Sequence, residues 1–221
     1  MVALRAILFD VDGTLLDTRD AWVAAFDAGL AAVGSHAMAG REGARWIGTP
    51  IETIYTERCG LSGDTLRDAV REFQRSEADS LRLGVRAYPG IPEMVASLRR
   101  WSLGTLTNKR TDTTREALRL AGFLDAFVLV LGGDSVRRKK PAPDPVLQAA
   151  ASLRVPVAAC AVVGDTENDV RAGREAGAVT VGVTWGYGSR ARLEEAGVGY
   201  LIETPAALPP LVRALTPSTG T

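Results

Sequence analysis

The fold is decided by residues 7–14, which read Ile7-Leu8-Phe9-Asp10-Val11-Asp12-Gly13-Thr14. The apolar run at 6–9 is typical of a fully buried strand, and the Gly-Thr pair ends it. In an open α/β sheet, ligands bind just beyond the carboxyl ends of the strands. Asp10 and Asp12 therefore predict two carboxylates that face one pocket. Because like charges repel at this spacing, either one carboxyl keeps a proton or a cation joins them. The alternative is an ordinary turn, since Asp and Gly both favour turns.

From residue 89 onward, short apolar runs alternate with helical patterns. We expect strands at 103–106, 127–131, 159–163, 179–183 and 200–202. We expect helices at 91–100, 111–121, 145–153, 169–176, 189–196 and 205–215. This alternation predicts the α/β class, with a Rossmann-like parallel sheet and helices on both of its faces.

Residues 17–86 break this rhythm, because they contain helical patterns and almost no strand-like run. Apolar residues recur at helical spacing within 20–33, and a charged helical stretch follows at 64–83. We therefore expect an α/β core domain of residues 1–16 and 87–221, and an inserted helical cap domain of residues 17–86.

Composition limits the possible partners. The chain has 221 residues, of which 46% are hydrophobic, and its 26 Lys and Arg balance its 26 Asp and Glu. Such a chain can bury a core, and its charge does not favour nucleic acid or a membrane. Cys59 and Cys160 lack metal-site spacing and indicate free thiols of a reducing compartment. We expect a cytoplasmic protein, either a monomer or a homodimer.

Later strand ends supply further polar groups, each with a structural alternative. Thr107 and Asn108 could bind phosphate oxygens or begin a helix. Lys140, held before Pro141, could neutralise a carboxylate and a phosphate, whereas a basic cluster is usually solvated. Asp165 could complete an oxygen site for a hard cation. Asp169 could join that site or cap a helix.

In this order, the motifs resemble those of the haloacid dehalogenase superfamily of phosphatases. The resemblance spans nearly the whole chain and is closest to the phosphoglycolate phosphatase group. The stretches that carry it are residues 9–17, Trp46-Ile47-Gly48, Thr107-Asn108-Lys109, Gly132-Gly133-Asp134, residues 140–145, residues 163–169 and residues 183–188.

The resemblance implies a role for each motif residue. Asp10 would attack phosphorus and form an aspartyl-phosphate, while Asp12 would protonate the leaving oxygen and later activate water. Mg²⁺ would be held by Asp10, the backbone carbonyl of Asp12, and Asp165, with Asp169 in the outer shell. The transferring phosphoryl oxygens would be bound by Thr107, the Asn108 N–H and Lys140.

The position of the insertion implies a helical cap that selects the leaving group. Its pocket-facing loop would include Arg45, Gly48 and Thr49. Arg45 would pair with a substrate carboxylate, as in 2-phosphoglycolate, or would simply be exposed. We expect a Mg²⁺-dependent phosphatase of a small phosphomonoester, with 2-phosphoglycolate as the leading substrate.

Alternative functions stay open within the resemblance. The substrate could be a sugar phosphate or a pathway-specific metabolite, and a β-phosphoglucomutase-like phosphomutase shares the motifs. A non-enzymatic phospho-ligand binding protein would need a broken motif, and none is broken. Dehalogenases need neither metal nor leaving-group proton, so Asp12, Asp165 and Asp169 argue against that class. Phosphonatases need a cap lysine, and residues 18–86 contain none.

Overall fold

A computed structural model describes residues 3–81 and 85–216. Six parallel strands form one sheet in the order β5-β4-β1-β6-β7-β8. Their bounds are β1 Ala6–Phe9, β4 Ser102–Leu106, β5 Leu129–Leu131, β6 Cys160–Gly164, β7 Val179–Val183 and β8 Tyr200–Ile202. The strand order reverses beside β1, where one half of the sheet continues toward β5 and the other toward β8. The predicted α/β class and parallel sheet are confirmed.

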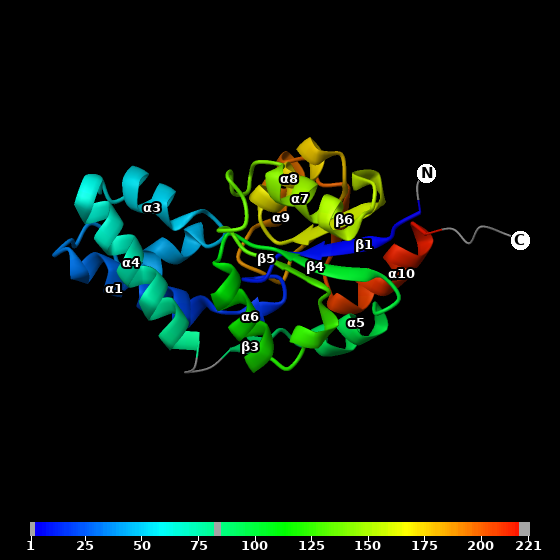
Figure 1. Cartoon of the computed structure of the whole chain (residues 1–221), viewed down its shortest axis with the longest axis horizontal. Coiled ribbons are helices and arrows are strands. Elements are labelled where there is room, and N and C mark those ends of the chain that lie inside the picture. Colours follow the sequence, from blue (N-terminus) through cyan, green and yellow to red (C-terminus); the bar gives the residue numbers. More distant parts are fainter. Residues whose placement is uncertain (1–2, 82–84, 217–221) are drawn as a thin grey trace, which may run out of the picture.

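Alternating side chains of β1 face two separate apolar layers. Ile7 and Phe9 pack into one cluster, while Ala6 and Leu8 pack into the other. The first layer is covered by α5 Ile91–Ser97, α6 Thr111–Leu120 and α10 Leu208–Ala214. The second is covered by α7 Asp144–Leu153 and α8 Glu167–Ala176, with α9 Arg190–Glu195 beside them. Figure 1 shows these two groups of helices above and below the sheet.

The helices of the insertion have a core of their own. They are α1 Arg19–Ala32, α2 Gly40–Gly43, α3 Ile51–Glu57 and α4 Gly63–Ser80, with a 3₁₀ turn at Ala44–Trp46. Aromatic rings fill this core: Trp22 stacks on Phe26 at a centroid distance of 5.0 Å, and Phe73 meets Tyr55 edge-on at 6.4 Å. In Figure 1 this helical insertion stands at one end of the sheet.

Two very short strands join the insertion to the sheet. β2 Leu16–Asp17 pairs antiparallel with β3 Arg86–Ala87, so the chain leaves and returns at the same place. The sequence analysis missed this pair, because two residues are too few to show a strand period. The expected domain boundary falls at this ribbon and stays a prediction.

Element ends differ from the sequence analysis by a few residues. The helix expected at 91–100 ends at Ser97, and the strand expected at 127–131 begins at Leu129. The expected helix at 205–215 begins as a 3₁₀ turn, Pro205–Ala207, and further 3₁₀ turns lie at Leu124–Ala126 and Val157–Ala159. Residues 82 and 83, the expected end of the 64–83 helix, lie outside the described residues.

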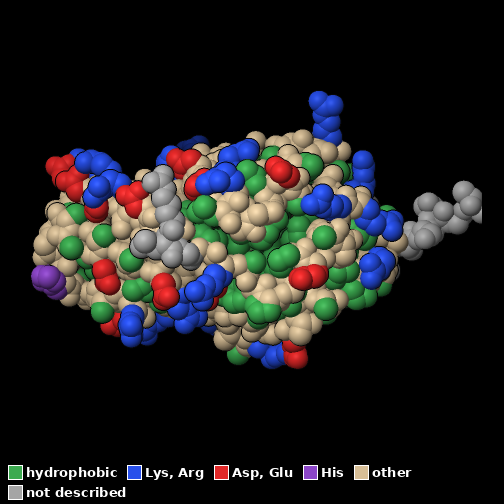
Figure 2. All heavy atoms as spheres, turned by 90° about the horizontal axis from the view of Figure 1, so that it is seen from below, with side chains coloured by type: hydrophobic (Ala, Val, Ile, Leu, Met, Phe, Trp, Pro, Cys, Tyr) green, Lys and Arg blue, Asp and Glu red, His purple; other side chains and the backbone are tan. Residues whose placement is uncertain are grey.

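The surface carries charges of both signs. Figure 2 shows acidic and basic side chains spread over the same face, with apolar side chains between them. Within residues 3–81 and 85–216, no helix is long and apolar enough to span a bilayer.

Candidate active site

Four loops at one edge of the sheet bring the predicted polar residues together. Asp10 follows β1, Thr107 follows β4, Asp165 follows β6, and Lys140 precedes α7. All four are buried. Lys140 Nζ lies 2.9 Å from Asp10 Oδ1 and also pairs with Asp169. The sequence-predicted core residues therefore converge on one cleft.

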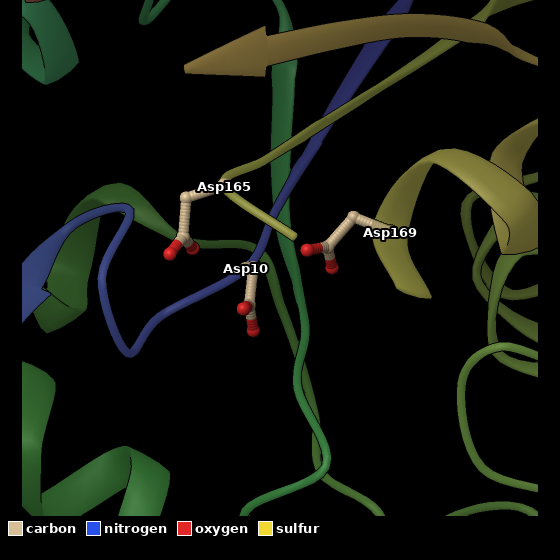
Figure 3. Close-up of side chains that lie close together, drawn as sticks. All are labelled: Asp10, Asp165 and Asp169. Carbon is tan, nitrogen blue, oxygen red and sulfur yellow. The ribbon is translucent and has the colours of Figure 1, made fainter. Parts of the chain in front are cut away.

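Three carboxylates surround one small space. Asp10, Asp165 and Asp169 each offer an oxygen atom, and these atoms lie within 4.8 Å of one another. Figure 3 shows Asp10 and Asp165 on loops at strand ends and Asp169 on α8. Asp10 Oδ2 is buried and has no hydrogen-bond partner within the described chain. A hard cation prefers such oxygen donors, so the residues fit a divalent metal site.

Burial and mutual repulsion disfavour the charged forms of these acids. Burial is the main cause that raises the pKa of Asp10; Lys140 opposes it, and the neighbouring carboxylates add to the rise. Burial, followed by the charge of Asp169, raises the pKa of Asp165 to about 7. Burial alone would lower the pKa of Lys140, but Asp10 and Asp169 outweigh it and keep the amine charged. A bound cation would relieve the remaining repulsion.

Hydrogen bonds from two distant segments fix the Asp165 carboxylate. Thr14 Oγ1 donates to Asp165 Oδ1 at 2.8 Å, and the Tyr187 N–H donates to Oδ2 at 2.8 Å. Gly13, with φ +88°, passes so close that an added Cβ would lie 2.3 Å from Asp165 Oδ2. The loop after β1 therefore needs glycine at position 13.

We expect Gly13→Ala to destabilise the protein and weaken divalent-metal binding. Positive φ costs a non-glycine residue about 1–3 kcal/mol, and here the methyl group must also displace Asp165. Gly34→Ala is the matched control, because Gly34 has φ +66° and nothing within 4 Å of an added Cβ. Urea unfolding and the metal-induced rise in melting temperature measure both effects. An unchanged metal response in Gly13→Ala would contradict this account.

Asp169 takes part in helix capping and in the carboxylate cluster. Thr166 and Asp169 form a capping box at the start of α8, in which Thr166 N–H and Oγ1 both donate to Asp169 Oδ2. Its other oxygen, Oδ1, accepts from Lys140 Nζ. Asp169 therefore caps α8 and also pairs with Lys140.

The Asn108 side chain joins the sheet edge to the insertion. Its Nδ2 donates to the carbonyl oxygens of Gly48 (2.9 Å) and Lys140 (3.0 Å), and its Oδ1 accepts from the Lys140 N–H. The amide side chain is thus occupied by three hydrogen bonds to the backbone. Gly48 has φ +93°, and its added Cβ would meet Thr166 at 3.1 Å, so it permits a close approach.

A cavity of about 260 Å³ lies between the sheet edge and the insertion. Its core side includes Asp10, Asp12, Thr107, Asn108 and Lys109, and its insertion side includes Trp22, Ile47, Gly48, Thr49, Ile51, Glu52, Phe73, Gln74 and Glu77. Two of the three residues predicted for the insertion loop, Gly48 and Thr49, therefore line it.

Arg45 does not line this cavity, so of the two alternatives for this residue the exposed side chain is the one found. Its side chain is 60% exposed and pairs with Glu42 at 2.9 Å. It lines a separate shallow crevice with Glu167 and Arg192. The 3₁₀ turn directs Arg45 back toward its own helical neighbour, so a contact with a substrate carboxylate in the cavity has no support from its position.

The sequence analysis missed one buried ion pair at the cavity. Lys109 pairs with Glu77 of α4 and lies 3.3 Å from Asp12 Oδ2. Burial alone would lower the pKa of Lys109, but the nearby carboxylates of Asp12 and Glu77 outweigh burial and raise this pKa. Burial raises the pKa of Glu77, although the charge of Lys109 acts in the opposite direction. The sequence feature that could have indicated this ion pair is Glu77 itself, because it is an acid on the buried side of α4, which also includes Ala69, Phe73 and Ser80.

The fold and the site together define an α/β protein with a helical insertion and a buried cluster of three carboxylates that fits a divalent metal. A family model, described as haloacid dehalogenase-like hydrolase, matches residues 7–183. The chain belongs to this family, and the match confirms the resemblance found in the sequence. Its relatives and fold indicate a hydrolase that acts on phosphate esters, and members of this kind generally use a divalent metal.

Named relatives cover most of this chain. Phosphoglycolate phosphatase of Neisseria meningitidis is 34% identical over 202 residues, which is 87% of this chain and 85% of the relative. A probable phosphatase, IndB, of Dickeya dadantii is 32% identical over 90% of this chain and 89% of its own. Both alignments extend well beyond the four motifs.

Solved structures share the fold. A predicted phosphatase from Clostridium acetobutylicum has a TM-score of 0.87 at 22% identity, covering 96% of this chain and 100% of its own. A predicted phosphoglycolate phosphatase from Haemophilus somnus has a TM-score of 0.84 at 24% identity, covering 96% and 99%. At these identities the likeness concerns the architecture, including both the sheet and the helical insertion.

Proposed function

We propose that this protein is a Mg²⁺-dependent phosphatase of a small phosphomonoester that works through an aspartyl-phosphate. The observation that carries the proposal is the orphaned Asp10 Oδ2, a buried carboxylate oxygen beside Lys140 and two further carboxylates. Lys140 holds the other oxygen of Asp10 and so fixes the direction of the free one. This arrangement suits an attacking oxygen.

In the first step, Asp10 Oδ2 attacks phosphorus and the bond to the leaving oxygen breaks. Lys140, the Thr107 hydroxyl and the Asn108 N–H bind the phosphoryl oxygens and keep the group in line. Asp12 gives its proton to the leaving alkoxide. Thr18 Oγ1 donates to Asp12 Oδ1 at 2.6 Å, and this contact orients the Asp12 carboxyl group.

In the second step, water hydrolyses the aspartyl-phosphate. Asp12, now ionised, takes a proton from that water as the P–O bond to Asp10 breaks. Asp10 is thereby regenerated and inorganic phosphate is released. The same residue serves as acid and then as base, as microscopic reversibility requires.

The metal would be held by Asp10, Asp165 and the backbone carbonyl of Asp12, with Asp169 in the outer shell. Mg²⁺ supplies charge neutralisation, which allows a carboxylate and a phosphate to approach each other. Asp165 is placed for this by Thr14 and the loop at Tyr187. Asp169 reaches the site mainly through Lys140, because its oxygens already accept from Lys140 and Thr166.

The helical insertion, residues 17–86, would act as a cap that excludes water and selects the leaving group. Gly48 and Thr49 form the part of its loop that meets the cavity, while Arg45 is left without this role. The paired β2 and β3 form the hinge region. A cap is useful here because an aspartyl-phosphate must form without water and then be hydrolysed by it.

The names of the relatives support 2-phosphoglycolate as the substrate. The cavity supports a second candidate, a phosphomonoester of an uncharged alcohol. Apolar side chains such as Trp22 and Phe73 line the cap side, together with the acids Glu52 and Glu77. The lining cations Lys109, Lys139 and Arg110 are each paired with carboxylates. Glu77 and Glu52 are the partners of Lys109 and Lys139, so a second anionic group on the substrate would find these cations already neutralised.

A matched pair of substrates tests both points. 2-Phosphoglycolate and 2-hydroxyethyl phosphate have similar size but differ in one carboxylate charge. We expect Mg²⁺-dependent phosphate release, with kcat/KM at least about 10-fold higher for the uncharged ester if the pairing of the lining cations decides. The reverse order would identify the carboxylate as a recognition element. Absence of phosphate release from these esters and from a broad panel of phosphorylated metabolites would contradict the phosphatase assignment.

A further inference from the structure

Three charged side chains join the cap to the proposed proton donor. Glu77 lies on α4 of the cap, Lys109 follows β4, and Asp12 follows β1. The Lys109 ammonium pairs with Glu77 Oε1 and lies 3.3 Å from Asp12 Oδ2. All three residues line the cavity, Asp12 and Lys109 on its core side and Glu77 on its cap side.

Burial makes this contact sensitive to cap position. Glu77 is 4% exposed and Lys109 is 7% exposed, so solvent screens this ion pair little while the cap is seated. A second pair, Lys139 with Glu52, also joins core and cap, but its side chains are 26% and 42% exposed and solvent screens it. Only the first pair also touches Asp12. Separation of the cap from the core would leave Lys109 without its cap partner.

We propose that Glu77 is a positioning residue, which acts through Lys109 to couple cap closure to the placement of the Asp12 carboxyl group. This inference rests on the proposed function, because it assigns Asp12 the role of proton donor. When the cap is seated, Glu77 holds Lys109 beside Asp12 Oδ2 while Thr18 holds Oδ1. The plane of the Asp12 carboxyl group is then set by a contact at each side, Oδ2 stays the oxygen that faces the cavity to carry the proton, and both contacts exist only when the leaving group is enclosed.

The coupling predicts an effect that depends on the leaving group. An alkoxide needs the Asp12 proton as its P–O bond breaks, whereas p-nitrophenolate leaves without one. We compare kcat/KM, because it reports the transfer of the phosphoryl group to Asp10 and not the later hydrolysis, in which Asp12 serves every substrate. We expect Glu77→Gln to lower kcat/KM for 2-hydroxyethyl phosphate by about 30-fold, which is less than the roughly 10²–10⁴-fold of a whole general acid because Asp12 itself remains. With p-nitrophenyl phosphate we expect a loss below about 3-fold. A merely structural role would lower both rates alike.

Glu72→Gln is the matched control, because Glu72 lies on the same helix, pairs with Arg75 and does not line the cavity. It should leave both rates unchanged, while Glu77→Asp should restore part of the alkyl rate. If Glu77→Gln does not fold, the paired variant Glu77→Met with Lys109→Met removes both buried charges and should show the same selective loss. Equal losses for the two esters in the folded variant would overturn the inference. Wild-type turnover of both esters with Mg²⁺, measured first, tests the proposed function separately.

Discussion

Replacement of Asp10 by Asn is expected to reduce turnover by at least about 10⁴-fold, the scale on which loss of a nucleophile acts in other covalent mechanisms. An amide oxygen is a far weaker nucleophile than a carboxylate, and no aspartyl-phosphate can form on it. The measurement is phosphate release with saturating Mg²⁺, together with mass spectrometry of acid-quenched enzyme, in which only the wild type should carry a phosphoryl group.

The same substitution should leave the fold intact. Asp10 is buried beside Asp165 and Asp169, so its ionised form is disfavoured in the metal-free protein. The neutral amide removes one of these charges and is expected to keep or raise the melting temperature without metal. Loss of activity together with a lower melting temperature would instead indicate an unfolded variant.

Asp68→Asn is a suitable control, because Asp68 is a half-exposed acid that pairs with Arg71 on the surface of α4. It removes the same charge without touching the cleft, and its turnover should match that of the wild type. Wild-type turnover in Asp10→Asn would contradict the covalent mechanism.

Replacement of Asp165 by Asn is expected to weaken Mg²⁺ binding by at least about 100-fold. Outer-shell changes alone cost about 10–100-fold, and Asp165 is proposed as a direct ligand. A metal at 100 times its dissociation constant stabilises the folded state by about 2.7 kcal/mol. The wild type should therefore show a clear Mg²⁺-induced rise in melting temperature, and Asp165→Asn should lose it. The Asp68→Asn control should keep it.

Binding of the metal should also depend on pH. Burial raises the pKa of Asp165 to about 7 in the metal-free protein, so below that pH the carboxyl group holds a proton that competes with the cation. The apparent affinity for Mg²⁺ should fall as pH decreases from about 7 toward 5. Calorimetric titration at several pH values measures this, and a pH-independent affinity in this range would argue against Asp165 as a ligand.

The sheet and the core part of the site could be predicted because both follow simple rules. Buried parallel strands appear as short apolar runs, and their carboxyl ends meet at one edge, so Asp10, Thr107 and Asp165 had to be neighbours. Lys140 was chosen from a basic cluster by the adjacent proline, and the structure buries it against Asp10. These positions depend on topology rather than on side-chain detail.

Two other residues show where sequence patterns fail. The neighbours of Arg45 in the chain predict that it faces the pocket. The direction of a side chain on a one-turn 3₁₀ segment, however, depends on tertiary packing. Glu77 lies in a charged helical stretch, and its partner Lys109 is 32 positions away, so no local pattern shows which residue it pairs with. The two residues can be paired only when the position of the insertion relative to the sheet is known, and no local sequence pattern contains that information.

The ribbon of β2 and β3 has a consequence for how such proteins diversify. Leu16 pairs with Ala87 and Asp17 pairs with Arg86, so both crossings of the chain lie within one narrow neck. A graft between these four residues would exchange the insertion side of the cavity in one step, but it would have to keep Thr18 and Glu77, whose contacts reach Asp12 directly or through Lys109. The insertion can thus diversify as a unit only while these two contacts to the sheet side are retained.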